Sequence, residues 1–167
     1  YQYGVWCGGS GTVSMTDYYG ISILNVYFDQ PKTAGIHVQY NVPANFRVGI
    51  TAINCRALGC DWGYVCEERG EYNSLMSCHA YENTFGGWKN RGGNNSWLGG
   101  SITYNPIGVS LIGGINDGHS HMQGATVNHN TISVYASGLA NGYEFQGCDI
   151  HVGDIKILDS EKIRFIG

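Results

Sequence analysis

The chain has 167 residues and a formal net charge of −4, with 13% charged and 43% hydrophobic residues. The charged fraction is about half of the roughly 25% typical of globular domains, whereas the apolar fraction is ordinary. Disordered chains show the opposite balance, so this composition argues against disorder. The absence of a basic run argues against nucleic acid as a partner, and no apolar stretch reaches the ~18 residues that a membrane span requires.

Short β-prone runs separated by Gly, Asn, Asp and Pro make up the first third of the chain, a pattern typical of all-β proteins. The run Ile21–Phe28 is apolar on both faces, which favours a central strand covered on both sides. The predicted strands of this part are Thr12–Thr16, Ile21–Phe28, Ile36–Tyr40 and Phe46–Ile53, with a turn at Asn41-Val42-Pro43.

Six cysteines without a CxxC pair indicate disulfides rather than a redox dithiol or a zinc knuckle. Extracellular chains use cysteine in this way, so we expect an oxidising compartment. The expected bridges join Cys7 to Cys148 and place two further bonds within the 55–78 cluster, although the sequence does not determine the pairing. The cysteines are Cys7, Cys55, Cys60, Cys66, Cys78 and Cys148.

The cysteine-rich segment is also the most highly charged part of the chain, with Glu67, Glu68, Arg69 and Glu71 in close succession. Apolar residues then fall at helical spacing, which predicts one short helix here, with a disulfide-stapled loop as the alternative. The residues at this spacing are Tyr72, Leu75, Met76 and Ala80.

Beyond Gly86-Gly87 the β pattern returns, and Asn141-Gly142 predicts a type I′ hairpin. The chain shows no repeat of fixed period and no linker, so we predict a single extracellular β domain over residues 1–167. Its expected fold is a disulfide-stabilised antiparallel β-sandwich or jelly roll with at most one short helix. The predicted strands are Ser101–Tyr104, Ile107–Ile112, Thr131–Ala136, Tyr143–Phe145, Asp149–Val152, Asp154–Leu158 and Lys162–Phe165.

An aromatic and amide-rich stretch among glycines is the first candidate binding site. Aromatic rings stack on the apolar faces of sugars, and Asn side chains donate to and accept from hydroxyls without the cost of burying a charge. The alternative is that the rings pack a core and the Asn-Gly pairs form turns. The candidate ligand-binding residues are Tyr81, Trp88, Asn90, Asn94, Asn95 and Trp97.

Two features favour secretion. Asn94-Asn95-Ser96 is an N-glycosylation sequon in a polar, Gly-rich stretch. The chain begins at Tyr1, without a Met or a charged-then-apolar leader, which fits a mature chain whose signal peptide has been removed. We therefore predict a secreted glycoprotein with a glycan on Asn94.

Three histidines form a candidate metal site. His119 and His121 share one face if this segment is a strand, and His129 would complete an open tris-His site. The spacing resembles the HxH of cupin-type metal sites, but the downstream Glu and Gly-Pro pattern of that family is missing. Solvated histidines in a Gly-rich turn are the alternative, and no cofactor is otherwise implied.

Catalysis has little support in the sequence. There is no GxSxG elbow, HExxH motif or P-loop, and a cysteine nucleophile conflicts with full disulfide pairing. Carboxylates beside aromatic residues, at Asp17, Asp61 and Glu82, leave a glycosidase open as an alternative.

The stretch 92–143 holds a single charged residue, Asp117, counting His as neutral. Strands with so few charges pair readily with other chains when they lie at a sheet edge. The leading hypothesis is a secreted, non-catalytic, lectin-like or adhesin-like module that binds a glycan or cell-surface ligand. The alternatives are a self-assembling subunit of an extracellular filament or coat, and a secreted hydrolase or metal-dependent enzyme.

Overall fold

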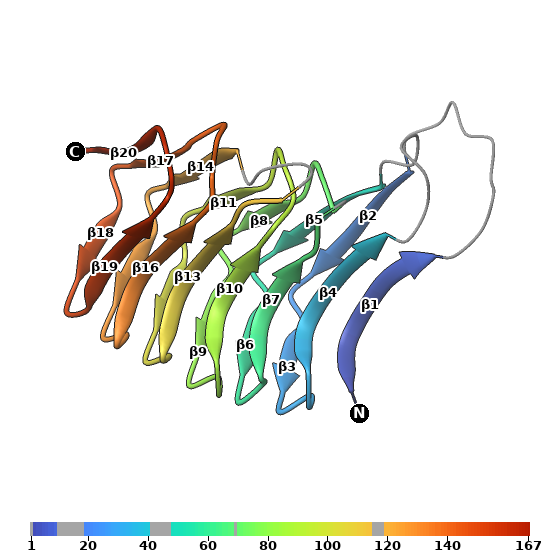
Figure 1. Ribbon diagram of the computed structural model, residues 1–167. Coiled ribbons are helices and arrows are strands. Elements are labelled where there is room, and N and C mark those ends of the chain that lie inside the picture. Colours follow the sequence, from blue (N-terminus) through green and yellow to red (C-terminus); the bar gives the residue numbers. More distant parts are fainter. Residues whose placement is uncertain (1, 10–18, 41–47, 69, 115–118) are drawn as a thin grey trace.

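In a computed structural model, the protein is a stack of short strands wound into a parallel β-solenoid (Figure 1). The structure describes residues 2–9, 19–40, 48–68, 70–114 and 119–167. Within these ranges the chain forms strands and turns only, so no helix there is long and apolar enough to cross a membrane. Each turn of the chain contributes one strand to each sheet in succession, and every described strand pair is parallel.

Three sheets, here named A, B and C, form the sides of the solenoid. Sheet A contains β1 (Tyr3–Gly9), β4 (Ala34–Tyr40), β7 (Trp62–Cys66), β10 (Gly86–Asn90), β13 (Ile107–Ile112), β16 (Ile132–Ser137) and β19 (Asp154–Leu158). Sheet B contains β2 (Tyr19–Leu24), β5 (Val48–Ile53), β8 (Ser74–Met76), β11 (Ser96–Leu98), β14 (Ser120–Gln123), β17 (Tyr143–Gln146) and β20 (Ile163–Ile166). Sheet C contains β3 (Tyr27–Asp29), β6 (Arg56–Leu58), β9 (His79–Tyr81), β12 (Ser101–Thr103), β15 (Thr126–Asn128) and β18 (Asp149–His151).

The corners of the solenoid are tight turns through single residues with positive φ. The turns from sheet B to sheet C lie at Asn25, Asn54, Ser77, Gly99, Gly124 and Gly147, which are separated by 29, 23, 22, 25 and 23 residues. The turns from sheet C to sheet A lie at Gln30, Gly59, Glu82, Tyr104, His129 and Val152, with the same five separations. Gly and Asn tolerate this conformation best, and they occupy five of the six corners from sheet B to sheet C but only one, Gly59, of the six from sheet C to sheet A.

The core consists of columns of inward-facing side chains, one from each turn of the solenoid. One column on sheet A runs through Val5, Ile36, Tyr64, Trp88, Val109, Val134 and Ile155. The facing column on sheet B runs through Ile23, Ala52, Leu75, Trp97, Met122, Phe145 and Phe165. Both columns are buried from the second turn to the penultimate one, which supplies the apolar burial that stabilises the fold.

A buried asparagine ladder satisfies the backbone at the corner between sheets C and A. The Asn83 side chain accepts from the Cys60 backbone N–H at 3.0 Å, and the Asn83 backbone N–H donates to Asn105 Oδ1 at 3.1 Å. The Asn105 backbone N–H donates in turn to Asn130 Oδ1 at 2.9 Å. Because buried backbone groups need partners, this ladder holds successive turns in register.

Glycine on sheet A allows sheets A and C to approach each other closely. A Cβ on Gly87 would lie 2.3 Å from Ile102 Cγ2 and 2.9 Å from the Gly108 carbonyl oxygen. A Cβ on Gly35 would lie 2.9 Å from the Ala57 Cβ. Both distances are too short for a real side chain, so part of the high glycine content reflects packing between sheets.

The two ends of the solenoid differ in burial. In the first turn Ile23 and Phe28 are only 7% and 5% exposed. In the last turn Ile155 and Phe165, which continue the core columns, are 48% and 46% exposed. The edge strands β18, β19 and β20 therefore leave a cross-section of the core open to solvent.

The predicted antiparallel β-sandwich or jelly roll is wrong, because consecutive strands lie in different sheets and each pairs with a strand one turn later. The sequence indeed has no repeat of fixed period, but equivalent corners recur every 22 to 29 residues. The variable length of each turn hides this repeat from a search at fixed period. Alternating runs and Gly/Asn breaks are common to both folds, which explains the error.

Local predictions fail at the corners for the same reason. The predicted helix near Tyr72 is replaced by β8 and β9, with Ser77 at positive φ between them. Asn141-Gly142 forms no hairpin, because it links β16 of sheet A to β17 of sheet B. Ile21–Phe28 is split between β2 and β3 at Asn25, and the predictions at Thr12–Thr16 and Asn41-Val42-Pro43 fall outside the described residues.

The predicted disulfides are wrong as well: Cys55, Cys60, Cys66, Cys78 and Cys148 are all free thiols. With Cys148 free, the bridge to Cys7 does not form, and the Cys7 side chain itself lies outside the described structure. Three of the thiols follow corner residues directly and donate to a backbone carbonyl of a neighbouring turn, as Cys55 Sγ does to the Ile23 oxygen at 3.4 Å. The cysteines thus fill small inward positions, and they no longer argue for an oxidising compartment.

Burial keeps these thiols protonated. It raises the pKa of Cys60 and of Cys66 to about 12, and the pKa of Cys78 to about 11. A thiol must lose its proton to react, so these three side chains are chemically inert in the folded protein.

Candidate functional site

The outer face of sheet C, beside its corner with sheet B, carries a polar depression. Two corner residues of successive turns build its rim, and Asn54 Nδ2 donates to Asn25 Oδ1 at 2.9 Å. Their backbone N–H groups donate to the carbonyl oxygens of Ile53 and Met76. The amides are therefore fixed by the same ladder that forms the solenoid.

Sheet C supplies the floor and the aromatic walls of this depression. Tyr27 of β3 lies beside Arg56 of β6, which lies beside His79 of β9. Tyr81 lies two residues beyond His79 and forms the far wall. The depression has a volume of about 370 Å³, and its lining residues are Asn25, Val26, Tyr27, Asn54, Arg56 and Tyr81. We call it the Tyr27–Tyr81 depression.

The two groups beside Arg56 are held neutral. Partial burial, together with Tyr81 and Asp29, raises the pKa of the Tyr27 phenol above its usual value, so the hydroxyl keeps its proton. Burial, and then the nearby Arg56 charge, lower the pKa of His79, whose Nδ1 lies 2.9 Å from Ser101 Oγ. Arg56 is consequently the only charged side chain lining the depression.

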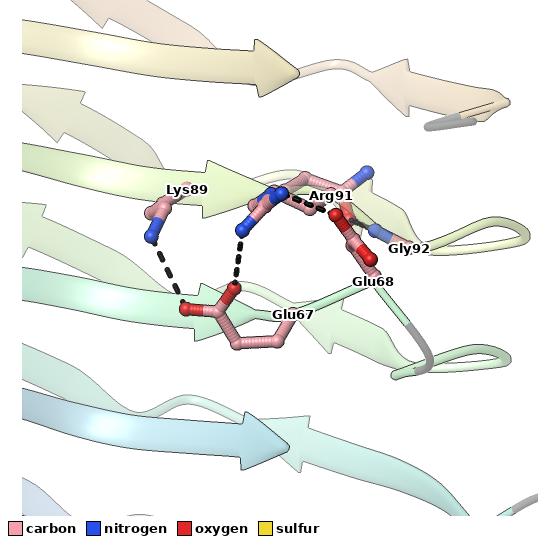
Figure 2. Close-up of polar contacts among 6 residues, drawn as sticks. Glu67, Glu68, Lys89, Arg91 and Gly92 are labelled. Carbon is pink, nitrogen blue, oxygen red and sulfur yellow. Dashed lines mark hydrogen bonds and ion pairs between the residues drawn. The ribbon is translucent and has the colours of Figure 1, made fainter. Parts of the chain in front are cut away.

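In a second polar cluster, on the outer face of sheet A, the charged side chains are paired with one another, unlike Arg56 (Figure 2). Lys89 Nζ lies 3.1 Å from Glu67 Oε1, and Arg91 contacts Glu67 at 3.4 Å and also pairs with Glu68. The carboxylates and cations satisfy one another, so this cluster joins neighbouring turns and offers little free charge to a ligand.

The predicted aromatic platforms lie in the core. Trp88 and Trp97 are fully buried, with ring centroids 5.6 Å apart, and Trp97 packs edge-on against Tyr64 at 5.3 Å. Neither indole is at the surface, so neither can stack on a sugar in this fold. The pattern that suggested a sugar platform comes from two core columns facing each other.

The predicted asparagines are divided between the interior and the surface. Asn95 is fully buried; it donates to Asn90 Oδ1 at 2.8 Å and accepts from the Asn73 backbone N–H at 3.0 Å. Asn90 is buried with it. Asn94 is half-buried at positive φ, and its backbone N–H donates to the His119 carbonyl oxygen. Glycosylation of Asn94 stays a prediction.

The three predicted metal ligands are not brought together. His121 lies on β14 opposite Glu144, whereas His129 lies at a corner with its ring stacked on Tyr104, the centroids 4.9 Å apart. His119 lines a second depression of about 280 Å³ near Lys162 and Arg164. Across the described part of the chain, no three His, Cys, Asp or Glu side chains form a metal-binding group.

Tyr81 is the one predicted ligand-binding residue that lines the Tyr27–Tyr81 depression. Sequence reasoning missed Tyr27 and Arg56, although each stands two residues after a corner asparagine, Asn25 and Asn54. The signal was the pair of Asn-x-Tyr and Asn-x-Arg segments, which becomes visible only when the chain is aligned turn by turn.

Comparisons of the chain with protein-family models, with curated proteins and with solved structures find no match. The strand topology defines the class of protein, a parallel β-solenoid. Because this fold alone does not imply a function, the functional argument depends on the chemistry of the site.

Proposed function

We propose that the protein is a non-catalytic recognition module that binds a glycan in the Tyr27–Tyr81 depression. The observation that supports this most is the combination of two aromatic walls with a rim of paired asparagine amides. Aromatic rings offer flat apolar surface to a sugar ring, while amides and phenol hydroxyls match its hydroxyls. An extracellular location belongs to the same proposal, since it now depends on the ligand rather than on disulfides.

The rigidity of the site favours binding. Each lining residue belongs to a strand or corner held by hydrogen bonds between successive turns, as at the Asn25 and Asn54 corners. A site that is already ordered loses little conformational entropy when a ligand binds. The depression is open and shallow, which suits the end or side of a chain of sugars better than an enclosed small molecule.

A glycan array probed with wild-type protein and with the Tyr81→Ala and Tyr27→Ala variants tests this function. We expect each variant to bind about tenfold more weakly or worse, because truncating an aromatic side chain central to an interface costs about 2 kcal/mol. Phe85→Ala is the matched control, because Phe85 is as exposed as Tyr27 but does not line the depression. An array without a hit, or equal binding by all four proteins, contradicts the proposal.

The open last turn supports a second candidate function, the assembly of copies of this chain. On β19, Ile155 faces the core column, so Asp154 and Lys156 face outward, 3.9 Å apart. If two copies of β19 pair in antiparallel fashion about a two-fold axis at Ile155, Asp154 of each copy lies opposite Lys156 of the other. The edge is thus complementary in charge to itself, and the pairing covers exposed Ile155.

Charge variants test this second candidate. Lys156→Asp places like charges across the pairing, as does Asp154→Lys, so each variant alone should be monomeric. A mixture of the two restores opposite charges and should form a heterodimer, measured by sedimentation velocity. If wild type is monomeric at high concentration, or if the mixture stays monomeric while wild type dimerises, this assembly is excluded.

A further inference from the structure

We propose that the bound glycan is anionic and that Arg56 binds its carboxylate or sulfate group. This inference rests on the proposed function and specifies its ligand. Arg56 lines the depression, has neutral register neighbours and, unlike four other cations of the described residues, has no carboxylate partner.

Arg56 lines the Tyr27–Tyr81 depression. It stands between Tyr27 and His79 on the outer face of sheet C, and its side chain is exposed. Its guanidinium presents a planar fork of donors that matches both oxygens of a carboxylate or sulfate. An anionic group held there would lie between the aromatic walls and beside the amide rim.

No carboxylate neutralises Arg56 among the described residues. Four other cations do have carboxylate partners: Lys89, Arg91, Lys156 and Arg164. Within the described part of the chain Lys32 and Lys162 form no ion pair either, but neither lines this depression. On a surface where most cations are paired, an unpaired guanidinium within a formed depression is available to an anionic ligand.

Asp29 lies near Tyr27 but forms no ion pair with Arg56. Asp29 follows Tyr27 on β3 and lies beside Leu58 rather than beside Arg56. Tyr27 and His79, the two register neighbours of Arg56, are uncharged at neutral pH, so they can donate to or accept from sugar hydroxyls without repelling an anion. The site therefore combines one charged group, the Arg56 guanidinium, with several neutral hydrogen-bonding groups.

Titration calorimetry with defined hexasaccharides tests the inference. The probes are a galacturonic acid hexamer for carboxylate, a heparin-derived hexasaccharide for sulfate, and maltohexaose as the neutral sugar. We expect at least one anionic probe to bind about tenfold more tightly than the neutral one and to weaken with salt. Arg56→Gln should remove this preference, whereas Arg56→Lys should keep part of it.

The controls separate this inference from the proposed function. If maltohexaose binds as tightly as the anionic probes and Arg56→Gln changes nothing, anion recognition fails, while weaker binding by Tyr81→Ala still supports a glycan site. If poly-glutamate binds as tightly as the galacturonic acid hexamer, the site recognises charge alone and the inference is overturned. If no sugar binds, the proposed function fails first.

Discussion

Two sets of aromatic and asparagine side chains face in opposite directions, one into the core from sheets A and B and the other outward at sheet C and its corner with sheet B. The inner set, with Trp88, Trp97 and Asn95, is fully buried; the Trp97 indole N–H donates to the Gly99 carbonyl oxygen at 2.7 Å, and Asn95 donates to Asn90 Oδ1 at 2.8 Å. The outer set, with Tyr27 and Asn25, is exposed, Tyr27 by 53%. The residue types are alike, so what separates structure from recognition here is which side of the strand or corner each residue occupies.

This contrast predicts different consequences of mutation. Residues of the inner set pack and satisfy the core, and losing them should reduce the free energy of unfolding. Residues of the outer set contact few core atoms, and losing them should affect binding while leaving stability within about 0.5 kcal/mol.

Trp97→Ala should have the largest effect on stability. The indole is fully buried between Tyr64 and Trp88, so its removal leaves a cavity and should lower the free energy of unfolding by about 3–5 kcal/mol. Urea unfolding monitored by circular dichroism measures this change, with Tyr27→Ala as the surface counterpart. A stable Trp97→Ala variant that loses only ligand binding would break the comparison.

Asn105→Ala tests the buried ladder. The Asn105 side chain accepts from both the backbone N–H and the Nδ2 of Asn83, at 3.1 and 2.9 Å, and its loss leaves these buried donors without a partner. Each such group costs roughly 1–3 kcal/mol, so we expect a loss of about 2 kcal/mol or more. Asn128→Ala, on the outer face of sheet C, is the control and should change stability by less than about 0.5 kcal/mol. Equal losses of stability in the two variants would contradict a structural role for the ladder.

Acidification should lower stability through His37. This side chain is 7% exposed, and burial lowers its pKa, an effect that nearby Glu67 partly opposes and Lys89 reinforces. The unfolded chain therefore binds a proton more readily, so the contribution of His37 is complete above its ordinary pKa of about 6.5 and is lost as pH falls below that value. The urea midpoint should fall from pH 7.5 to pH 5.5, and the fall should be smaller in His37→Gln. The lowered pKa of His79 adds a change of the same sign.

Reduction should have the smallest effect. Since the five described cysteines outside β1 are free thiols, a reducing agent should leave the unfolding midpoint unchanged. Thiol titration of the non-reduced protein should detect these five groups after denaturation, and few of them before it, because burial protects them. A midpoint that drops on reduction would restore the disulfide interpretation.

The sequence pattern predicted well where strands lie, but not which strands pair with each other. Ile107–Ile112 and Asp154–Leu158 coincide with β13 and β19, because local alternation and Gly breaks mark where a strand begins and ends. The pairing of β13 with β10 and β16 depends on a repeat whose length varies between turns, and no local pattern records it. Cysteine count misled for a related reason: Cys55 and Cys78 occupy equivalent corner positions, and their spacing reflects the repeat.

The candidate site was predictable only in part. Tyr81, a predicted ligand-binding residue, lines the Tyr27–Tyr81 depression, but Trp88 and Trp97 were placed at a surface that they do not reach. Inward and outward positions become distinguishable once the corners Asn25, Asn54 and Ser77 are aligned. Arg56 then emerges as the cation that stands two residues after a corner and lacks an acidic partner.

The most direct test of the account is a titration of isotope-labelled protein with the galacturonic acid hexamer, followed by two-dimensional NMR. The account predicts saturable shifts concentrated on the backbone amides of Asn25, Tyr27, Asn54, Arg56 and Tyr81 and on the side-chain amides of the two asparagines, with the indole signals of Trp88 and Trp97 unchanged. Shifts centred on the edge strands β19 and β20, or on the indoles, or none with any of the three hexasaccharides, would contradict it.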